Sequence, residues 1–332
     1  MTTTPPDLPA DLDPFLAAAG WADAAVEPIP GDASFRRYFR LRRASGETAM
    51  LMDAPPPHED PGPFLRAARW LDENGMRAPR ILAEKPDRGF VLLEDFGVSR
   101  MRDYLDQWPA DEMPVYKGAV DALVRLHDLP AGPFVGYTMA EYQREVRLFI
   151  DWYCTARNLY VDVPGFTAAW ETVLADLLPR QRPGVTVLRD YHAENIMLLG
   201  TLDKQGLLDF QDALVGHPAY DLVSLLQDAR RDVSPDLEAA MIDHYLRQTG
   251  ADREQFEADY ARLGTQRNVK IVGIFVRLWR RDGKPRYLDL IPRVWALMER
   301  DLKHPALAPV AAWFDANIPA ELRAEGGGKF DA

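Results

Sequence analysis

Hydrophobic and polar residues alternate in several short stretches of the first third of the chain, as they do in β-strands with one buried face. The clearest of these stretches are residues 35–43, 48–52 and 90–93, and the first two are joined by a short turn-forming segment. Apolar residues instead recur at helical spacing over residues 11–30 and 64–74. We therefore predict a small β-rich part that carries two helices.

The pattern changes after Phe96, because apolar residues from there on recur mainly at helical spacing. Helices with one apolar face are predicted for residues 113–129, 141–159 and 221–231. Residues 269–278 are apolar nearly all round, which predicts a buried helix. The second part of the chain is therefore expected to be mainly helical.

Together these patterns predict a protein of the α+β class with two lobes. We place the boundary near Phe96, which gives a β-rich N-lobe over residues 1–96 and a mainly α-helical C-lobe over residues 97–332. A chain of 332 residues is long enough to bury a core in each of two such lobes.

Charge and cysteine content narrow the expected partners and compartment. The net charge of -12 argues against nucleic acid or an anionic membrane as a partner, because both attract basic surfaces. The single cysteine, Cys154, excludes an intramolecular disulfide and is typical of a reducing compartment, so we expect a cytoplasmic protein. We also expect it to be a monomer. No run of about 18 apolar residues and no signal-peptide pattern is present, so we predict neither a membrane span nor export.

Three polar residues form the pattern that points to chemistry. Asp190 and Asn195 are five residues apart in a predicted loop, and Asp209 follows at the end of a short apolar run after a predicted hairpin. Phosphoryl transfer needs a carboxylate that receives the proton of the acceptor hydroxyl, with oxygen ligands for Mg²⁺ beside it. We therefore predict Asp190 as the catalytic base and Asn195 and Asp209 as ligands of Mg²⁺.

Further motifs around these residues resemble the aminoglycoside phosphotransferase and choline kinase superfamily. Those enzymes have a two-lobed, protein-kinase-like fold and carry H-x-D-x-x-x-x-N, apolar-Asp-aromatic and G-[DH]-P-x-x-D-L motifs. The residues that match here are Asp190, Asn195, Asp209, Gly216, Pro218, Asp221 and Leu222. Leu188 stands where the family usually has His, and Asp221 is expected to brace the catalytic loop from a helix N-terminus.

The N-lobe is predicted to bind ATP. Small residues in a kinase phosphate loop let backbone N–H groups approach the phosphates. The strand of residues 48–52 ends in Met52 where kinases carry a lysine, so we expect an arginine of the preceding strand to offset the phosphate charge. The expected nucleotide contacts are Gly31, Asp32, Ala33, Ser34, Arg36, Arg37 and Arg40, with the backbone of Glu94 and Phe96 as the adenine hinge.

The acceptor site is predicted from aromatic and basic residues of the C-lobe. Flat aromatic faces and arginine side chains suit sugars and carboxylates. The candidates are Trp152, Tyr153, Arg277, Arg280 and Arg281. A second interpretation of these residues is ordinary, because Tyr153 shares an apolar helix face and residues 277–286 also fit a charged helix end.

A closer resemblance is to the bacterial kinases of cell-wall amino sugars. It rests on the segments 31–38, 52–56, 92–97, 208–213 and 273–278. Those enzymes use ATP and Mg²⁺ to phosphorylate the anomeric hydroxyl of N-acetylmuramate and N-acetylglucosamine in peptidoglycan recycling. The resemblance implies that Met52 is a trait of the family, and that an N-acetylmuramate carboxylate would explain the basic run of residues 277–286.

Two other functions remain open at this point. One is an aminoglycoside-type phosphotransferase, because an acidic protein suits a polycationic acceptor. The other is a nucleotide-binding, pseudokinase-like module, which Met52 and Leu188 favour because each replaces a residue that kinases usually carry. The sequence contains none of the Walker A, G-x-S-x-G or H-E-x-x-H motifs of other enzyme classes.

Overall fold

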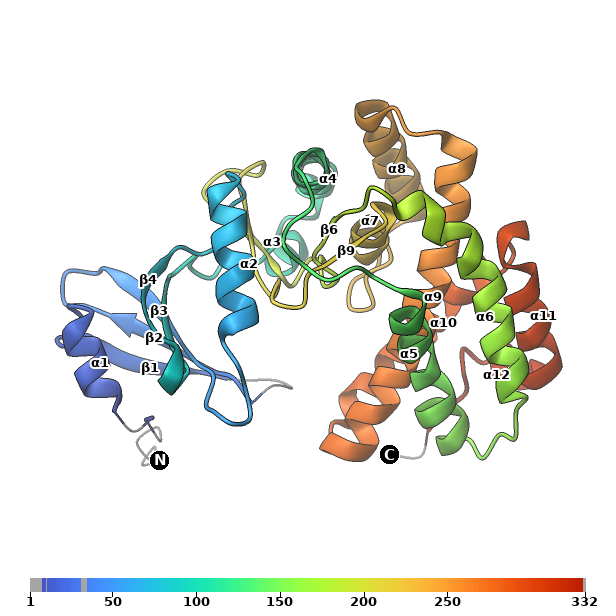
Figure 1. The fold of residues 1–332 in the computed structure, drawn as a ribbon, viewed down its shortest axis with the longest axis horizontal. Helices are drawn as coiled ribbons and strands as arrows, with labels where there is room; N and C mark the ends of the chain where they lie inside the picture. The colour runs from blue at the N-terminus through green and yellow to red at the C-terminus, as the bar shows by residue number, and fades with distance from the viewer. Residues whose placement is uncertain (1–7, 10, 31–34, 331–332) are drawn as a thin grey trace. The chain divides into compact units, whose positions relative to one another are not determined.

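The computed structural model describes residues 8–9, 11–30 and 35–330. The chain divides into two compact units. Figure 1 shows the ribbon coloured by residue number from the N-terminus to the C-terminus. The first unit comprises residues 1–100 together with 196–212, and the second comprises residues 101–195 together with 213–332. The predicted N-lobe, residues 1–96, therefore falls within the first unit, which also takes in a later hairpin.

The first unit is built on a five-stranded antiparallel sheet with the strand order β1-β2-β3-β5-β4. A separate two-stranded hairpin, β7 and β8, precedes Asp209 as predicted. The bounds are β1 Ala25–Ile29, β2 Arg37–Arg42, β3 Thr48–Asp53, β4 Ile81–Lys85, β5 Phe90–Glu94, β7 Ile196–Leu198 and β8 Gln205–Leu207, with α1 Leu12–Ala18 and α2 Gly62–Glu73.

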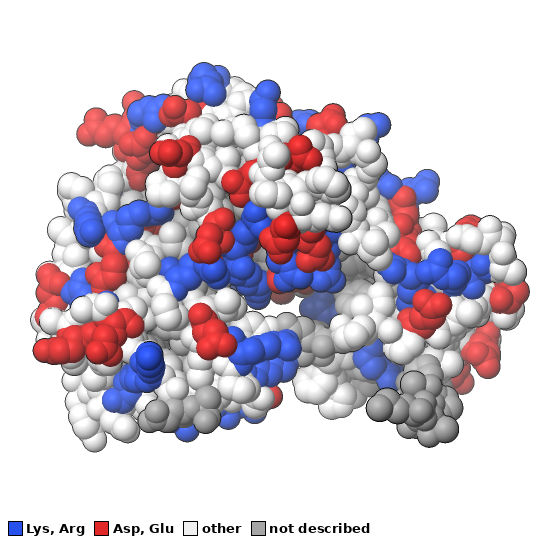
Figure 2. Space-filling view, turned by 180° about the vertical axis from the view of Figure 1, so that it is seen from behind, with Lys and Arg blue, Asp and Glu red and all other residues white. Residues whose placement is uncertain are grey.

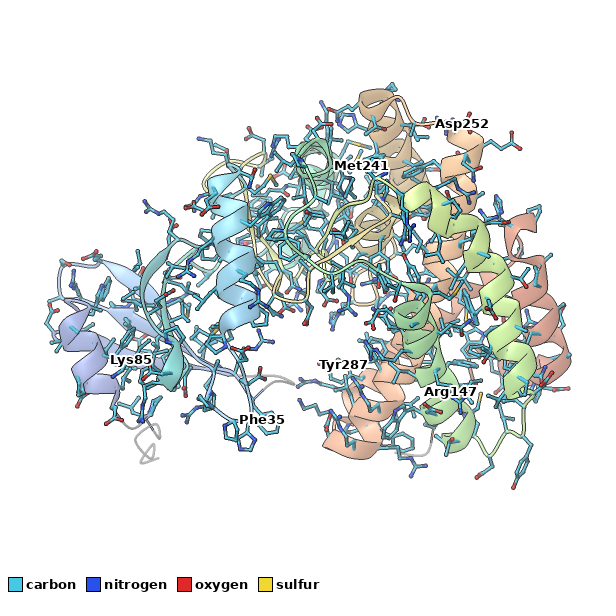
Figure 3. The ribbon with its side chains drawn as sticks, in the orientation of Figure 1. Phe35, Lys85, Arg147, Met241, Asp252 and Tyr287 are labelled. Carbon is cyan, nitrogen blue, oxygen red and sulfur yellow. The ribbon has the colours of Figure 1, made fainter. Side chains whose placement is uncertain are left out.

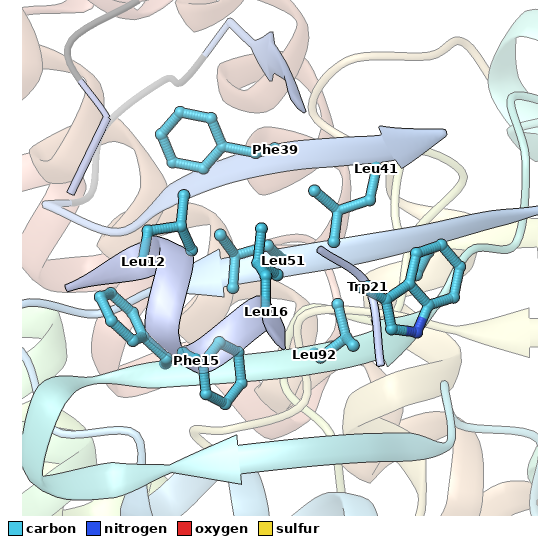
Figure 4. Packing of buried hydrophobic residues seen from close by; sticks show 10 residues of the cluster. Leu12, Phe15, Leu16, Trp21, Phe39, Leu41, Leu51 and Leu92 are labelled. Carbon is cyan, nitrogen blue, oxygen red and sulfur yellow. The ribbon is translucent and has the colours of Figure 1, made fainter. Parts of the chain in front are cut away.

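Alternation along the strands gives this sheet one apolar face. Phe39, Leu41 and Leu51 point to the side covered by α1, whose Phe15 and Leu16 pack against them (Figure 4). Because successive residues of a strand point to opposite faces, Tyr38 and Arg40 of β2 lie on the other side of the sheet, together with Met50 and Met52 of β3. The core between α1 and the sheet thus holds β2 and its arginines in place.

Two strands of the five-stranded sheet, β1 and β4, were missed by the sequence analysis. Residues 11–30, predicted as one helix, contain α1 and then the edge strand β1, in which Pro28 is tolerated because an edge strand needs fewer ladder hydrogen bonds. The strand β4 forms the other edge, and its residues are only partly buried. Edge strands lack the strong apolar alternation on which the prediction relied.

The second unit is mainly helical, with one short antiparallel pair of strands, β6 and β9. The strand bounds are β6 Val185–Val187 and β9 Leu214–Gly216. The helices are α3 Met101–Gln107, α4 Glu112–Asp128, α5 Met139–Leu148, α6 Val163–Leu177, α7 Ala219–Leu226, α8 Pro235–Thr249, α9 Arg253–Asp282, α10 Ile291–Asp301, α11 Ala308–Asn317 and α12 Ala320–Ala324.

The central element of this unit is α9, against which α5, α7 and α10 pack. The buried helix predicted for residues 269–278 is confirmed as part of it. The helix predicted for residues 141–159 needs correction, because α5 ends at Leu148 and the chain continues as a π-helical turn over Phe149–Cys154. At this point Gly273 of α9 lies so close to the α5 backbone that a Cβ atom would collide with the carbonyl of Leu148.

The predicted α+β class is confirmed by this combination of antiparallel sheet and helices. Within the described ranges, no helix is both long enough and apolar enough to cross a membrane. On the face shown in Figure 2, acidic and basic side chains are interspersed. Exposed or partly exposed ion pairs of the chain include Arg69–Glu84 and Arg253–Glu257. Surface pairs of this kind contribute only about 0–1 kcal/mol each to stability.

Candidate active site

The predicted catalytic loop runs from Leu188 to Asn195 directly after β6, and it has no regular secondary structure. Its first turn is held by Asp221, whose Oδ2 and Oδ1 accept hydrogen bonds from the backbone N–H groups of Leu188 at 2.6 Å and Arg189 at 2.8 Å. Asp221 lies in the first turn of α7, where a helix favours a negative charge. The predicted bracing role of Asp221 is therefore confirmed.

Asp221 is completely buried, and burial raises the pKa of its carboxyl to about 7, although the two N–H donors lower it. The brace acts only on backbone atoms of the loop. The side chain at position 188 does not take part in it, and Leu188 is itself buried as an apolar residue. The replacement of the family's usual His by Leu188 therefore leaves this support of the loop intact.

The two polar residues predicted to act in this loop are joined within it. The Nδ2 group of Asn195 donates a hydrogen bond to the backbone oxygen of Asp190 at 3.0 Å. The carboxylate of Asp190 is half-buried. Because the amide of Asn195 uses its NH₂ group for this bond, the amide oxygen is the atom of Asn195 that suits a metal ion.

A buried cluster of charges surrounds the residue next to Asp190. The carboxylate of Glu145, on α5, accepts hydrogen bonds from Arg189, Tyr137, Lys270 at 3.2 Å and Gln266 at 3.0 Å. Burial alone would raise the pKa of Glu145, but Lys270 and then Arg189 outweigh burial and hold it at about 2. The carboxylate therefore stays ionised and ties the loop to α5 and α9.

The sequence analysis did not single out Glu145 or Lys270. One signal was present, since Lys270 stands inside the apolar run that predicted a buried helix, and a lysine there needs a partner. The partner could not be identified, because Glu145 lies 125 residues earlier in the chain. Arg189 also has a positive φ of 72°, which is uncommon for a residue with a side chain.

In the first unit, Asp209 follows the β7–β8 hairpin and is exposed. Its φ of 59° is also positive, and its Oδ1 accepts a hydrogen bond from Nε2 of Gln211 at 2.8 Å. The next residue, Phe210, is buried and stacks on Phe64 of α2 with ring centroids 5.1 Å apart. The packed aromatic ring fixes the position from which the Asp209 carboxylate projects.

The part of the chain that the structure describes contains no group of three or more His, Cys, Asp or Glu side chains that could hold a metal ion. Asp209 and Asn195 each offer one hard oxygen ligand. Each is an oxygen ligand of the type that Mg²⁺ takes, since this ion is often bound through one or two protein oxygens while substrate phosphates and waters complete its shell.

The β2 arginines differ in the side of the sheet from which they project. Tyr38 of β2 pairs with Met52 of β3, the position of the kinase lysine, and directly opposed residues share a face. Arg40 follows Tyr38 by two positions and so projects from that same face, whereas Arg37 projects from the other. Arg37 donates to Asp53 at 2.6 and 2.9 Å.

Arg36 and Arg40 have different surroundings. Arg40 pairs with Asp95 at 2.7 Å and donates to the backbone oxygen of Gly97 at 2.8 Å, so it braces the predicted hinge. Arg36 pairs with Glu59 at 3.5 Å. Burial raises the pKa of Tyr38, the nearby Arg36 lowers it and Asp209 raises it again, so both charged groups act on the same phenol. Gly31, Asp32, Ala33 and Ser34 lie outside the described residues.

The predicted adenine hinge is fixed by its side chains. Glu94 accepts hydrogen bonds from Arg77 at 2.8 Å and Arg80 at 3.2 Å, and the bond from Arg77 is the main reason why the pKa of Glu94 lies below its usual value. The guanidinium of Arg77 lies 4.7 Å from the ring centre of Phe96. Gly206 also lies against this ring, because a Cβ atom at this position would come within 2.5 Å of Phe96.

The acceptor candidates on the π-helical turn are placed differently from one another. Tyr153 is fully buried, stacks on Phe149 with ring centroids 4.8 Å apart and donates to the backbone oxygen of Gly327 at 2.8 Å. This environment favours a packing role for Tyr153, as the ordinary interpretation held. Trp152 is half-buried.

The three arginine candidates lie at the C-terminal end of α9. Arg280 is exposed, and its guanidinium lies 4.0 Å from the ring centre of Trp279. Arg281 is exposed and pairs with Asp282 at 2.8 Å. Arg277 differs from both, because it is half-buried and its Nε atom is buried without a hydrogen-bond partner.

The first unit carries the antiparallel sheet, the predicted hinge and the hairpin before Asp209, and the second unit carries the braced loop with Asp190 and Asn195. The model of the phosphotransferase enzyme family matches residues 25–262. The chain belongs to this family. The family and the two-lobed fold predicted from the sequence are confirmed, since the choline/ethanolamine kinase family protein of Mesorhizobium loti has the same fold, with a TM-score of 0.62 at 16% identity. That similarity covers 90% of this chain and 98% of the other.

Relatives in sequence are closer. The N-acetylmuramate/N-acetylglucosamine kinase of Caulobacter vibrioides is 37% identical, over 93% of this chain and 96% of its own. The enzyme of the same name from Pseudomonas aeruginosa is 40% identical, over 90% of each chain. The similarity therefore extends through both units of this phosphotransferase and is not confined to the catalytic motifs.

Proposed function

We propose that this phosphotransferase is a kinase that transfers the γ-phosphoryl group of ATP to the anomeric hydroxyl of N-acetylmuramate and N-acetylglucosamine. The observation that carries the proposal is the 37–40% identity to kinases named for these two sugars over nine tenths of the chain or more. The braced loop that presents Asp190 supports it, because every amino-sugar kinase of this type needs a base at that place.

Asp190 is the proposed catalytic base. Its carboxylate orients the anomeric hydroxyl and takes the proton as the sugar oxygen bonds to the γ-phosphorus. The bond between that phosphorus and the oxygen bridging to the β-phosphate breaks, and ADP leaves. A hemiacetal hydroxyl is more acidic than an ordinary alcohol, so a weak base such as the carboxylate of Asp190 can accept its proton more readily.

Asn195 and Asp209 are the proposed ligands of Mg²⁺, which when bound would neutralise charge on the phosphates. The amide oxygen of Asn195 suits this role because its NH₂ group is engaged with Asp190. The positive φ of Asp209 is a second support, since residues held in sparsely populated backbone regions cluster at functional sites.

The N-lobe, residues 1–96, is proposed to bind ATP, and the C-lobe, residues 97–332, to hold the catalytic loop and the acceptor. Among the arginines near the strand-3 position of Met52, we assign the phosphate contact to Arg36, which pairs with Glu59 and whose charge, like that of Asp209, acts on Tyr38. Arg37 is paired with Asp53 on the other side of the sheet, and Arg40 is paired with Asp95 of the hinge. The backbone of Glu94 and Phe96 is the proposed adenine contact, with Gly31, Asp32, Ala33 and Ser34 over the phosphates.

The proposed place of the reaction is peptidoglycan recycling in the cytoplasm, with the protein acting as a monomer. Both acceptor sugars are constituents of the cell wall, and phosphorylation at the anomeric carbon converts a released sugar into an activated form. The negative charge of the chain supports the expectation that neither nucleic acid nor a membrane is a partner.

The test is a coupled assay of ADP release with N-acetylmuramate, N-acetylglucosamine or kanamycin as the acceptor. Turnover of the two sugars, with a product whose phosphate is released by mild acid, is expected for an anomeric phosphate. Turnover of kanamycin alone would overturn the proposal in favour of an aminoglycoside phosphotransferase. Binding of ATP without turnover of any acceptor would instead support the pseudokinase-like module.

A further inference from the structure

One face of α9 carries a row of residues with a common direction. Gln266, Lys270, Gly273, Arg277 and Arg281 follow one another at intervals of three or four residues, so they lie on the same side of the helix. The first half of this row is occupied by α5, which packs beside α9 in Figure 3. The row therefore begins with residues that contact α5 and ends with Arg277 and Arg281 near the C-terminal end of α9.

The residues of this row that contact α5 lie next to the predicted catalytic loop. Lys270 donates to Glu145, which also accepts a hydrogen bond from Arg189, the residue next to the proposed base Asp190. Gly273 follows, pressed against the backbone of α5. Arg277 comes seven residues after Lys270, which is about 10 Å along a helix. An amino sugar held at Asp190, together with the arginine side chain, can span this length.

Arg277 lacks a counter-ion. It is half-buried, its Nε atom is buried without a hydrogen-bond partner, and it forms no ion pair with any residue that the structure describes. Burial and then the positive charge of Arg281 lower its pKa, Arg144 adds to this, and Asp282 opposes it. Asp282 is itself held by Arg281 at 2.8 and 3.0 Å, so its charge is already largely offset.

Arg281 is paired with Asp282 and Arg144 with Glu141, whereas Arg277 has no such ion pair among the described residues. A half-buried cation without a partner is unfavourable unless an anion completes it. The segment opposite also departs from regular helix, since the π-helical turn Phe149–Cys154 begins where α5 meets Gly273. Interruptions of this kind are frequent at functional sites. Both observations point to a ligand rather than to a structural partner for Arg277.

We propose that Arg277, with Arg144 and Arg281 beside it, binds the carboxylate of an acidic amino sugar, namely the lactyl carboxylate of N-acetylmuramate. This inference rests on the proposed function and adds to it a residue that distinguishes the two acceptors. N-acetylglucosamine presents the same anomeric hydroxyl but has no carboxylate. Arg277 is thus a specificity-determining residue and not part of the phosphoryl-transfer machinery.

The experiment compares kcat/KM for the two sugars in wild-type protein, in Arg277→Gln and in the control Arg253→Gln. The control removes an exposed arginine at the other end of α9, where it is paired with Asp243 and Glu257. We expect Arg277→Gln to lower kcat/KM for N-acetylmuramate by roughly 10- to 100-fold, as the loss of a charge-assisted hydrogen bond does. The kcat/KM for N-acetylglucosamine should stay within about twofold of wild type, because that sugar has no carboxylate for the arginine to bind.

Salt and a second variant sharpen the result. The KM of wild type for N-acetylmuramate should rise with ionic strength while that for N-acetylglucosamine does not, because only the first contact is ionic. Arg277→Lys should retain part of the preference for N-acetylmuramate over N-acetylglucosamine, because lysine keeps the positive charge but cannot bind a carboxylate in the bidentate geometry of arginine. This milder variant also decides the question if Arg277→Gln does not fold.

The outcomes separate the two claims. Loss of N-acetylmuramate turnover alone in the Arg277 variants supports the carboxylate site. An equal loss on both sugars, or no loss on either, overturns it while wild-type turnover still upholds the proposed function. If wild-type protein turns over neither sugar, the proposed function fails and the carboxylate site fails with it.

Discussion

The carboxylate of Asp221 receives the backbone N–H of Leu188 at 2.6 Å, and in this way the start of the catalytic loop is fixed from the N-terminus of α7. A second bond, from the N–H of Arg189, completes the brace. Both bonds are made to the main chain, so they do not depend on the residue type at position 188. The position of Asp190 therefore depends on a residue 31 places later in the sequence.

Asp221→Asn tests this brace. The amide keeps one oxygen acceptor but turns an NH₂ group towards the second N–H, so one buried donor loses its partner. We expect the free energy of unfolding to fall by about 2 kcal/mol and kcat to fall roughly tenfold. Urea unfolding and the coupled ADP assay measure the two effects. The control is Asp212→Asn at an exposed position, and equal behaviour of the two variants would refute the brace.

Glu145→Gln tests the buried cluster through its pH dependence. The pKa of Glu145 is about 2 in the folded protein against an ordinary value of 4.5, so the folded state favours the ionised carboxylate. Its contribution to stability is therefore complete above about pH 4.5 and is lost as the pH falls towards 2. At pH 7 we expect the variant to be less stable by about 3 kcal/mol, because Lys270 and Arg189 are left without their counter-ion.

The measurement for Glu145 is the free energy of unfolding in urea at a series of pH values. The difference between wild type and Glu145→Gln should narrow as the pH is lowered through 4. Glu257→Gln, which removes a half-exposed carboxylate on α9, is the matched control and should change stability little. A difference for Glu145→Gln that stays constant across this pH range would contradict the assigned ionisation.

Arg36→Ala tests the phosphate contact, with Arg37→Ala as its control. We expect the KM for ATP to rise roughly tenfold in Arg36→Ala, because a charged contact to a phosphate is lost. Arg37 is paired with Asp53 on the other side of the sheet, so its removal should change this KM less than about twofold. Steady-state kinetics at saturating acceptor measures both values. The assignment is wrong if Arg37→Ala has the larger effect.

Sequence patterns were sufficient for the parts of the fold that are governed locally. The strands β2, β3 and β5 were predicted because each has one face on the core under α1. The edge strands β1 and β4 were missed, since their residues are only partly buried and their alternation is weak. The end of α5 was not foreseen either, and at this point its backbone packs against Gly273 of a helix more than a hundred residues away, a contact that no local pattern reveals.

In the candidate site, too, features governed by local sequence were predicted and features that depend on tertiary contacts were missed. Asp190, Asn195 and Asp209 were identified because short motifs carry them, and their roles stay proposals. Glu145 was missed, because its importance arises from contacts with Arg189 and Lys270 that only the tertiary structure brings about. Tyr153 was included for its residue type, yet its surroundings are those of a core residue. Motif spacing thus predicts reacting groups, while their supports depend on packing.

The most direct measurement is the turnover of N-acetylglucosamine by wild-type protein and by Asp190→Asn, followed as ADP release with Mg²⁺-ATP. The variant should fold with the stability of wild type and bind ATP, while its kcat falls by roughly 10²- to 10⁴-fold, the range for loss of a general base. Wild-type turnover that is lost in this way is what the account predicts. A variant that turns over the sugar as fast as wild type, or a wild type that does not phosphorylate it, would contradict the account.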